Sequence, residues 1–186
     1  MKIIKDEDFL RSKVPMTKEE VRTITLSKMA LKTDDNILDI GGGSGAMAIS
    51  LAVNAPKGSV TTIEKNKISY DLIKKNKEKF QVDNLKIIHG FAPDDLPNES
   101  FNKIFVGGTY GKMTEIFNYA DEFLKENGII LLNFITIENI GKAVDLLKKY
   151  KYDYEIFQIT ISKSKRIKDL TLMQTNNTVT IIKGQR

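Results

Sequence analysis

The residues most able to do chemistry in this chain lie in one stretch, Ile37–Gly45, which reads ILDIGGGSG. A short apolar run that carries Asp39 gives way to glycines at positions 41, 42, 43 and 45. Glycine lets a loop take positive φ angles and lets a ligand approach its backbone, and the N–H groups that open the next helix face such a ligand. Further on, Glu64 ends a second apolar run, where a carboxylate can accept both hydroxyls of a ribose. The pattern predicts a site for a nucleoside-containing cofactor.

Two classes of cofactor use a loop of this kind. A dinucleotide site has the pattern G-x-G-x-x-G/A, which Gly41, Gly43 and Ala46 satisfy. Asp39 favours the other class, because a carboxylate beside the loop repels a pyrophosphate and attracts the ammonium and sulfonium groups of S-adenosylmethionine. We therefore expect S-adenosylmethionine, with Asp39 near its methionine end. The alternative role for Asp39 is to cap the following turn or helix.

The composition excludes several other kinds of chemistry. The 186 residues contain no cysteine, which rules out disulfides, a thiolate nucleophile and thiolate metal sites, and we expect no metal site. The length suits a single domain over residues 1–186. Residues 1–7 lack the apolar stretch of a signal peptide and no segment reaches transmembrane length, so we expect a cytoplasmic protein. The net charge of +5 suits an anionic substrate and suits plain solubility equally.

Short apolar runs alternate with helical patterns along the chain, which predicts an α/β fold with a mostly parallel sheet. Strands are expected at residues 36–40, 59–63, 85–89, 103–106 and 129–134, and helices at residues 17–31, 44–54, 67–80, 113–125 and 138–150. Residues 154–161 and 172–182 both have strand patterns with no helix between them. They predict a C-terminal antiparallel hairpin that completes seven strands, the Rossmann-like plan of class I methyltransferases.

In such a sheet, ligands lie beyond the carboxyl ends of the strands, so the loops that follow the strands are informative. Phe91 and Ala92 follow the third strand, and we expect their backbone to contact adenine, with the Phe91 ring either stacking or packing in the core. The loop Gly107–Gly111 follows the fourth strand and contains Tyr110. It lacks the Asn/Asp-Pro-Pro-aromatic set of base-amino methyltransferases and the Asp of metal-dependent O-methyltransferases. Its three glycines fit a large flat substrate or a tight packing turn.

Other polar residues have a structural role and a functional role open to them. Thr17 and Glu20 predict a capping box for the first helix, and Thr136 can cap its helix or touch substrate. His89 is the only histidine and is either structural or catalytic. Basic residues gather in two places, at Arg11 and Lys13 and in a C-terminal loop with Lys163, Lys165, Arg166 and Lys168. If both clusters lie at the mouth of the site, they would attract a polycarboxylate or a phosphate backbone.

Several stretches together resemble one known family. They are FLRSKVPMTKEEVR at 9–22, DIGGGSG at 39–45, HGFAPDDL at 89–96, FVGGTYG at 105–111 and the segment 133–138. The chain resembles the decarboxylating cobalt-precorrin-6B C15-methyltransferases of cobalamin biosynthesis, which match the C-terminal half of the bifunctional precorrin-6Y C5,15-methyltransferases. It departs from the family at Phe91, where an acid is usual, and at Tyr110, where a small residue is usual.

The resemblance implies S-adenosylmethionine-dependent methylation of a corrinoid precursor, with loss of carbon dioxide from an acetate side chain, in a homotetramer. With the loop argument above, it gives the following expected cofactor contacts: Thr17, Asp39, Gly41, Gly42, Gly43, Ser44, Gly45, Glu64, Phe91 and Ala92. A conjugated ring can supply a nucleophilic carbon by itself, so the enzyme needs mainly shape, cations for carboxylates and one proton donor. The candidates for these catalytic roles are Arg11, Lys13 and Tyr110.

Two other functions stay open from the residues alone. An RNA methyltransferase that acts on a ring nitrogen of adenine would have a similar glycine loop. It is disfavoured because no RNA-binding module accompanies the basic clusters and few aromatic residues lie among them, so nucleic acid is not expected as a partner. A non-enzymatic binder is less consistent still, because the glycine loop and Glu64 are both present.

Overall fold

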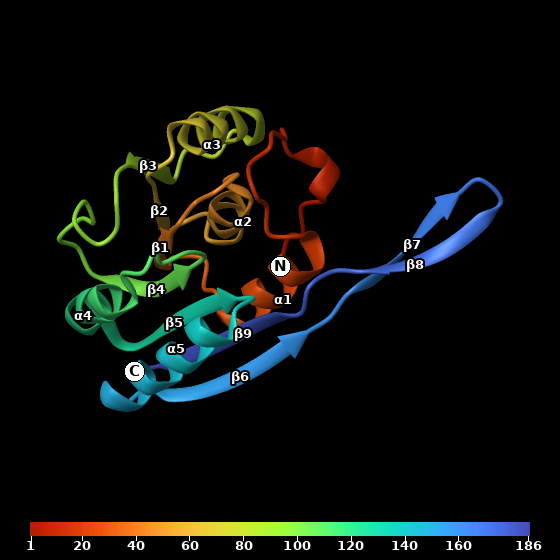
Figure 1. Ribbon diagram of the computed structural model, residues 1–186. Helices are drawn as coiled ribbons and strands as arrows, with labels where there is room; N and C mark the ends of the chain where they lie inside the picture. The colour runs from red at the N-terminus through yellow and green to blue at the C-terminus, as the bar shows by residue number, and fades with distance from the viewer.

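The computed structural model describes residues 1–186 and contains a seven-stranded sheet in the order β3-β2-β1-β4-β5-β9-β6 (Figure 1). Its strands are β1 Asn36–Ile40, β2 Ser59–Glu64, β3 Leu85–His89, β4 Phe101–Val106, β5 Leu124–Phe134, β6 Asp153–Ile159 and β9 Val179–Gln185. The helices are α1 Glu19–Lys28, α2 Ala46–Asn54, α3 Lys67–Phe80, α4 Met113–Phe123 and α5 Ile137–Lys149, with a 3-10 turn η1 Asp6–Asp8. The predicted fold class is confirmed.

Side chains alternate across β1 and divide the core into two layers. Leu38 and Ile40 belong to a buried cluster with residues of α4 and α5 on one face. Ile37 belongs to a second cluster with residues of α1, α2 and α3 on the other face. Because both faces are covered, the central strands are almost continuously buried and mostly apolar, with Asp39 in β1 and Lys103 in β4 as buried exceptions.

The sheet is parallel from β3 to β5, and β9 then pairs antiparallel with both β5 and β6. The chain enters at β1, builds outward to β3 and returns to β4 on the other side of β1. The loops that follow β1 and β4 therefore leave the same edge of the sheet and diverge from each other there. A crevice at this reversal of strand order is the usual ligand site of such sheets.

The first helix differs from its prediction. It begins at Glu19 after the N-cap Lys18, and no side chain caps it, so the expected capping box of Thr17 and Glu20 is wrong. The Glu20 carboxylate pairs with Lys163 instead, and the Thr17 backbone carbonyl accepts from Arg22. The helix also ends at Lys28, before the expected Leu31.

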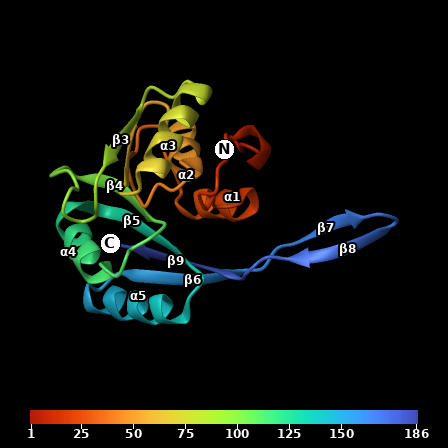
Figure 2. The same cartoon turned by 45° about the horizontal axis from the view of Figure 1, so that its top comes forward.

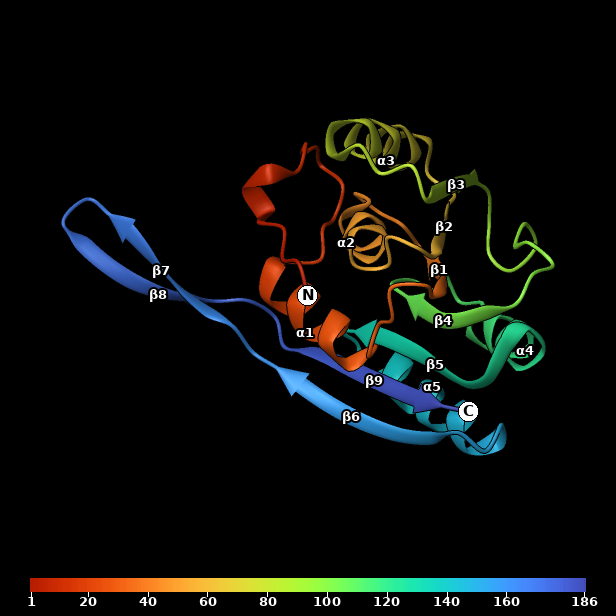
Figure 3. The same cartoon turned by 180° about the vertical axis from the view of Figure 1, so that it is seen from behind.

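The C-terminal hairpin is more elaborate than predicted. Between β6 and β9 the chain forms two further strands, β7 Ser162–Ile167 and β8 Leu170–Thr175, which pair only with each other. The single strand expected at 172–182 is thus two strands separated at 176–178. This β7–β8 arm projects away from the body in every view (Figure 2) (Figure 3), and all of its strand residues are exposed.

No helix of the protein combines the length and apolar character needed to cross a membrane.

Candidate functional site

A cavity of about 690 Å³ opens beyond the carboxyl ends of β1, β2, β4 and β5. Its wall comes from the chain before α1, the glycine loop, the loop after β4, the residues after β5 and the chain at the base of the arm. Parts of the chain that are distant in sequence therefore share one concave site of the size that holds small ligands. The structure brings together Thr17, Gly41–Ser44, Glu64 and Tyr110 as cavity residues.

The glycine loop has a conformation that other residues rarely adopt. Gly41, Gly43 and Gly45 have φ angles of +85°, +54° and +82°. A Cβ added to Gly41 would lie 3.1 Å from the Gly108 nitrogen, and one added to Gly43 would lie 3.3 Å from the Pro15 carbonyl oxygen. Both the backbone conformation and the close neighbours thus require glycine. Gly45 is the N-cap of α2 and does not line the cavity.

Glu64 is held beside this loop at the end of β2. Its side chain is buried and lines the cavity. One carboxylate oxygen accepts a hydrogen bond from the Gly43 N–H at 2.8 Å, and the other accepts from the Asn66 N–H at 2.8 Å. The predicted distal acid therefore lies next to the glycine loop, in a fixed orientation.

Asp39 lies deeper than predicted. It is fully buried and is not part of the cavity wall. Oδ2 accepts a hydrogen bond from the Thr62 hydroxyl at 2.7 Å, while Oδ1 has no partner. Burial raises the pKa of Asp39 to about 7; the Thr62 hydrogen bond lowers it and the nearby Glu64 charge raises it further. Its contact with a cofactor stays a prediction.

Phe91 and Ala92 line a smaller cavity next to the main one, together with Lys65 and Tyr110. The Phe91 ring centre is 6.3 Å from that of Tyr110. The Lys65 ammonium lies 3.5 Å from the Tyr110 ring centre and 5.3 Å from that of Phe91, both within cation–π range. Phe91 is half-buried at this cavity and belongs to neither core cluster, which favours the stacking role over the core role.

Tyr110 borders both cavities. It is 57% exposed and has a φ of +46°, the left-handed region that costs a bulky residue strain. Partial burial, with a smaller effect of the Glu64 charge, raises the pKa of Tyr110. A strained, exposed aromatic at a cavity mouth is a candidate ligand contact.

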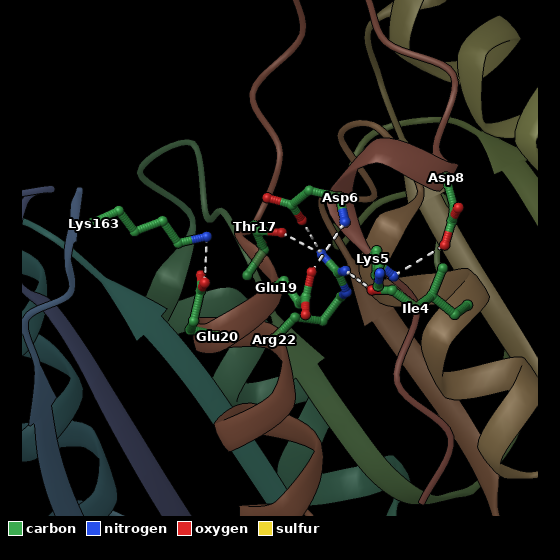
Figure 4. Close-up of polar contacts among 9 residues, drawn as sticks. All are labelled: Ile4, Lys5, Asp6, Asp8, Thr17, Glu19, Glu20, Arg22 and Lys163. Carbon is green, nitrogen blue, oxygen red and sulfur yellow. Dashed lines mark hydrogen bonds and ion pairs between the residues drawn. The ribbon is translucent and has the colours of Figure 1, made fainter. Parts of the chain in front are cut away.

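The other sequence candidates lie outside the cavity wall or on its rim. Arg11 and Lys13 are exposed and do not line the cavity, although the five residues after Lys13 do. His89 is exposed, has its Nε2 3.2 Å from the Lys65 carbonyl oxygen and does not line the cavity, which agrees with its structural role. Thr136 is at the N-cap position of α5 without a side-chain hydrogen bond, and it does line the cavity. Of the arm's basic residues, Lys163 pairs with Glu20 on α1 (Figure 4).

Sequence reasoning missed four residues that shape the site: Glu20, Arg22, Lys65 and Asn76. Glu20 lines the cavity, and its Oε2 is buried without a partner. Arg22 and Asn76 are buried polar side chains in helices, at 2% and 0% exposure. A helical periodicity gives no signal for them, because their partners lie in the chain before α1 and in the glycine loop.

Comparison with known proteins agrees with this architecture. A family model described as a precorrin methyltransferase domain matches residues 8–186. The chain is 36% identical over 187 aligned residues to a Sulfurisphaera tokodaii protein named "Probable cobalt-precorrin-6B C(15)-methyltransferase (decarboxylating)", covering 98% of this chain and 97% of that protein.

Two crystal structures share the fold over almost the whole chain. That of a precorrin-6y C5,15-methyltransferase from Geobacter metallireducens superposes with a TM-score of 0.93 at 33% identity, covering 98% of this chain and 96% of that one. That of a precorrin 8w decarboxylase from Methanobacterium thermoautotrophicum gives a TM-score of 0.92 at 26% identity, covering 98% and 99%.

Proposed function

Because this chain belongs to the precorrin methyltransferase family, we propose that it methylates C15 of cobalt-precorrin-6B and removes carbon dioxide from an acetate side chain of the same substrate. The observation that carries the proposal is the shared wall of the cavity. The glycine loop and Glu64 form one part of it, and the loops after β4 and β5 form another. A cofactor and the edge of a large ring can therefore meet in one enclosed space.

The residues present fit S-adenosylmethionine. Glu64 has the position to accept the ribose hydroxyls. The hollow beside Phe91 and Ala92 holds only about 10 Å³ in this structure, so the adenine contact of these two residues stays a prediction. The glycine loop and Thr17 would border the methionine end of the cofactor. Neighbouring backbone lies so close to Gly41 and Gly43 that a side chain at either position would crowd it. Asp39 lies beneath the loop, and its contact with the methionine end stays a prediction. When bound, the cofactor supplies an electrophilic methyl group.

The protein's own contribution to the reaction is alignment and proton supply. Holding two reactants in a productive geometry can lower a barrier by ~7–11 kcal/mol. The electron pair left by carbon dioxide enters the conjugated ring of the substrate, and the remaining carbon then takes one proton. Tyr110 is the candidate donor because it carries a phenol hydroxyl and lies at the cavity. Arg11 and Lys13 stay predicted contacts for substrate carboxylates, from the exposed chain just before the cavity wall.

We also propose that the protein assembles as a homotetramer. The β7–β8 arm supports this, because its exposed residues include Ile167, Leu170, Leu172 and Met173. A projecting pair of strands with large apolar side chains leaves both unpaired strand edges and apolar area for another subunit to cover. Sedimentation velocity of the wild type and of a Leu172→Lys, Met173→Lys variant tests the proposal; an unchanged sedimentation coefficient would refute the arm's role.

The direct test of the function is turnover followed by mass spectrometry. Incubation with S-adenosylmethionine and cobalt-precorrin-6B should give a product that has gained one CH₂ and lost one CO₂. A product with neither change would overturn the proposal. The RNA alternative is tested in parallel by titration with tRNA in the presence of S-adenosylmethionine, where tight binding with a steep salt dependence and no response to the corrinoid would favour it.

A further inference from the structure

The chain before α1 covers the glycine loop. Residues 4–17, here called the N-terminal segment, run beside α3 and α2 and then enter α1 (Figure 1). The residues at its end, from Val14 to Thr17, line the same cavity as Gly41–Ser44. The Pro15 carbonyl oxygen would lie 3.3 Å from a Cβ on Gly43. A ligand in this cavity is therefore bounded by the segment on one side and by the loop on the other.

Arg22 holds the two ends of the segment together. Its Nη2 donates to the Ile4 carbonyl at 2.5 Å, and its Nη1 donates to the Asp6 carboxylate at 3.0 Å and to the Thr17 carbonyl at 2.7 Å (Figure 4). The guanidinium is buried, so each of these donors needs its partner. Ile4 and Thr17 are thus fixed to the same point of α1.

Asn76 of α3 holds the middle of the segment and also holds the glycine loop. Its Oδ1 accepts from the Leu10 N–H at 2.8 Å, and its Nδ2 donates to the Leu10 carbonyl at 3.2 Å and to the Ser44 carbonyl at 3.1 Å. The side chain is completely buried. One amide therefore joins the N-terminal segment to the glycine loop. Asn76 is 66 residues from Leu10 and 32 residues from Ser44 in the sequence.

Between the Asn76 and Arg22 contacts, Leu10, Arg11, Ser12 and Lys13 are all exposed, and Met16 packs against the core cluster. Short exposed stretches with few buried contacts open locally at low free-energy cost. Asn76 and Arg22 hold the two ends of this stretch, and of the two only Asn76 also contacts the glycine loop.

We propose that Asn76 is a positioning residue that couples closure of the N-terminal segment to occupation of the cofactor site. This inference rests on the placement of S-adenosylmethionine given under Proposed function. If the cofactor binds better with the segment closed, then the cofactor must favour closure by the same factor, because such coupling is reciprocal. Asn76 transmits it without touching the cofactor, since it contacts only the backbone of Leu10 and Ser44.

The test compares Asn76→Ala with a matched control, Asn84→Ala. The Asn84 amide also bridges backbone, to the Ala52 carbonyl at 3.1 Å and the Ala55 carbonyl at 2.9 Å, but it contacts neither the segment nor the cavity. The measurements are the S-adenosylmethionine dissociation constant by calorimetry and amide hydrogen exchange of residues 4–17 with and without the cofactor.

In the wild type, the cofactor should slow exchange in the segment. In Asn76→Ala the affinity should fall about tenfold, the size of a typical coupling, and the cofactor should no longer slow exchange there. Asn84→Ala should keep both properties, whatever its thermal stability. A second variant, Leu10→Pro, removes the N–H that Asn76 accepts and fixes φ at this exposed position, and it should reproduce a smaller part of both changes.

Two results would overturn the coupling. One is an Asn76→Ala affinity equal to that of the wild type. The other is a reduced affinity with undiminished cofactor-dependent protection of the segment, which would mean that Asn76 acts through Ser44 alone. If Asn76→Ala does not fold, Leu10→Pro decides by the same two readouts. Failure of the cofactor placement is recognised separately, because Glu64→Ala would then bind the cofactor as the wild type does.

Discussion

The two sides of the cavity are built in opposite ways. On the side of β1 and β2, Asp39, Glu64 and Asn76 are buried, and their side chains bond to the backbone or to neighbouring side chains of the same region. On the side of β4 and β5, the cavity residues Tyr110 and Ile135 are 57% and 63% exposed. The first side is preformed for a ligand of fixed shape. The second leaves apolar and aromatic surface open, as a large planar substrate requires.

The largest effect that would test this contrast is the pH dependence caused by Asp39. Its pKa is raised from 3.8 to about 7, so the folded protein binds this proton more tightly than the unfolded chain. The stability that this group provides is complete below 3.8 and is lost as the pH rises toward about 7. The free energy of unfolding of the wild type, measured with a denaturant, should therefore fall by a few kcal/mol over this pH range relative to that of Asp39→Asn. If the free energies of unfolding of the wild type and of Asp39→Asn changed with pH in the same way, Asp39 would not be held in the buried state described.

The next effect concerns the cofactor alone. Glu64→Ala removes the acceptor for the ribose and for the Gly43 N–H, and we expect S-adenosylmethionine affinity to fall more than about tenfold, or roughly 1.4 kcal/mol. Calorimetric titration measures it. Glu115→Ala, which removes a surface carboxylate of α4 paired only with Lys112, is the control and should bind normally. An unchanged titration of Glu64→Ala would remove this residue from the site.

On the open side, Tyr110 should affect the substrate more than the cofactor. Tyr110→Ala should lower kcat/KM for the corrinoid about tenfold and weaken S-adenosylmethionine binding by a smaller factor, because the ring lies at the mouth of the main cavity and also borders the smaller one beside Phe91. Tyr110→Phe separates the packing contact of the ring from proton donation by the hydroxyl. Retained methylation with slowed decarboxylation would identify the hydroxyl as the proton donor, whereas full activity would limit Tyr110 to a packing contact.

The smallest effect should come from the ion pair between Lys163 and Glu20. These side chains are 53% and 31% exposed, so their attraction is screened, and Lys163→Ala should change the free energy of unfolding by less than about 1 kcal/mol. Chemical denaturation of this variant and of Lys165→Ala, which forms no ion pair, should give nearly the same curve. A large loss in Lys163→Ala alone would show that the base of the arm is part of the rigid, preformed side.

The preformed side was also the more predictable one. Glycines at 41, 43 and 45 and the acid at 64 specify a conformation and a charge through their own chemistry, and the structure places the loop and Glu64 together as expected. The prediction for Asp39 was less complete, because spacing alone does not tell whether a side chain points into a cavity or under its floor. For Tyr110, the sequence showed a glycine-rich loop, and only the fold showed which neighbours it meets.

The sequence by itself determined the alternation of strands and helices and the cofactor loop, because both depend on local hydrophobic pattern and on the freedom of glycine. Tertiary structure alone decided the start of α1, the projecting arm and the covering of the loop by the N-terminal segment. The covering of the loop depends on contacts between distant parts of the chain, such as Arg22 with Ile4 and Asn76 with Ser44, and the arm depends on the pairing of β7 with β8. Such partners leave no periodic trace, since either residue viewed alone is an ordinary polar side chain on a helix or a strand.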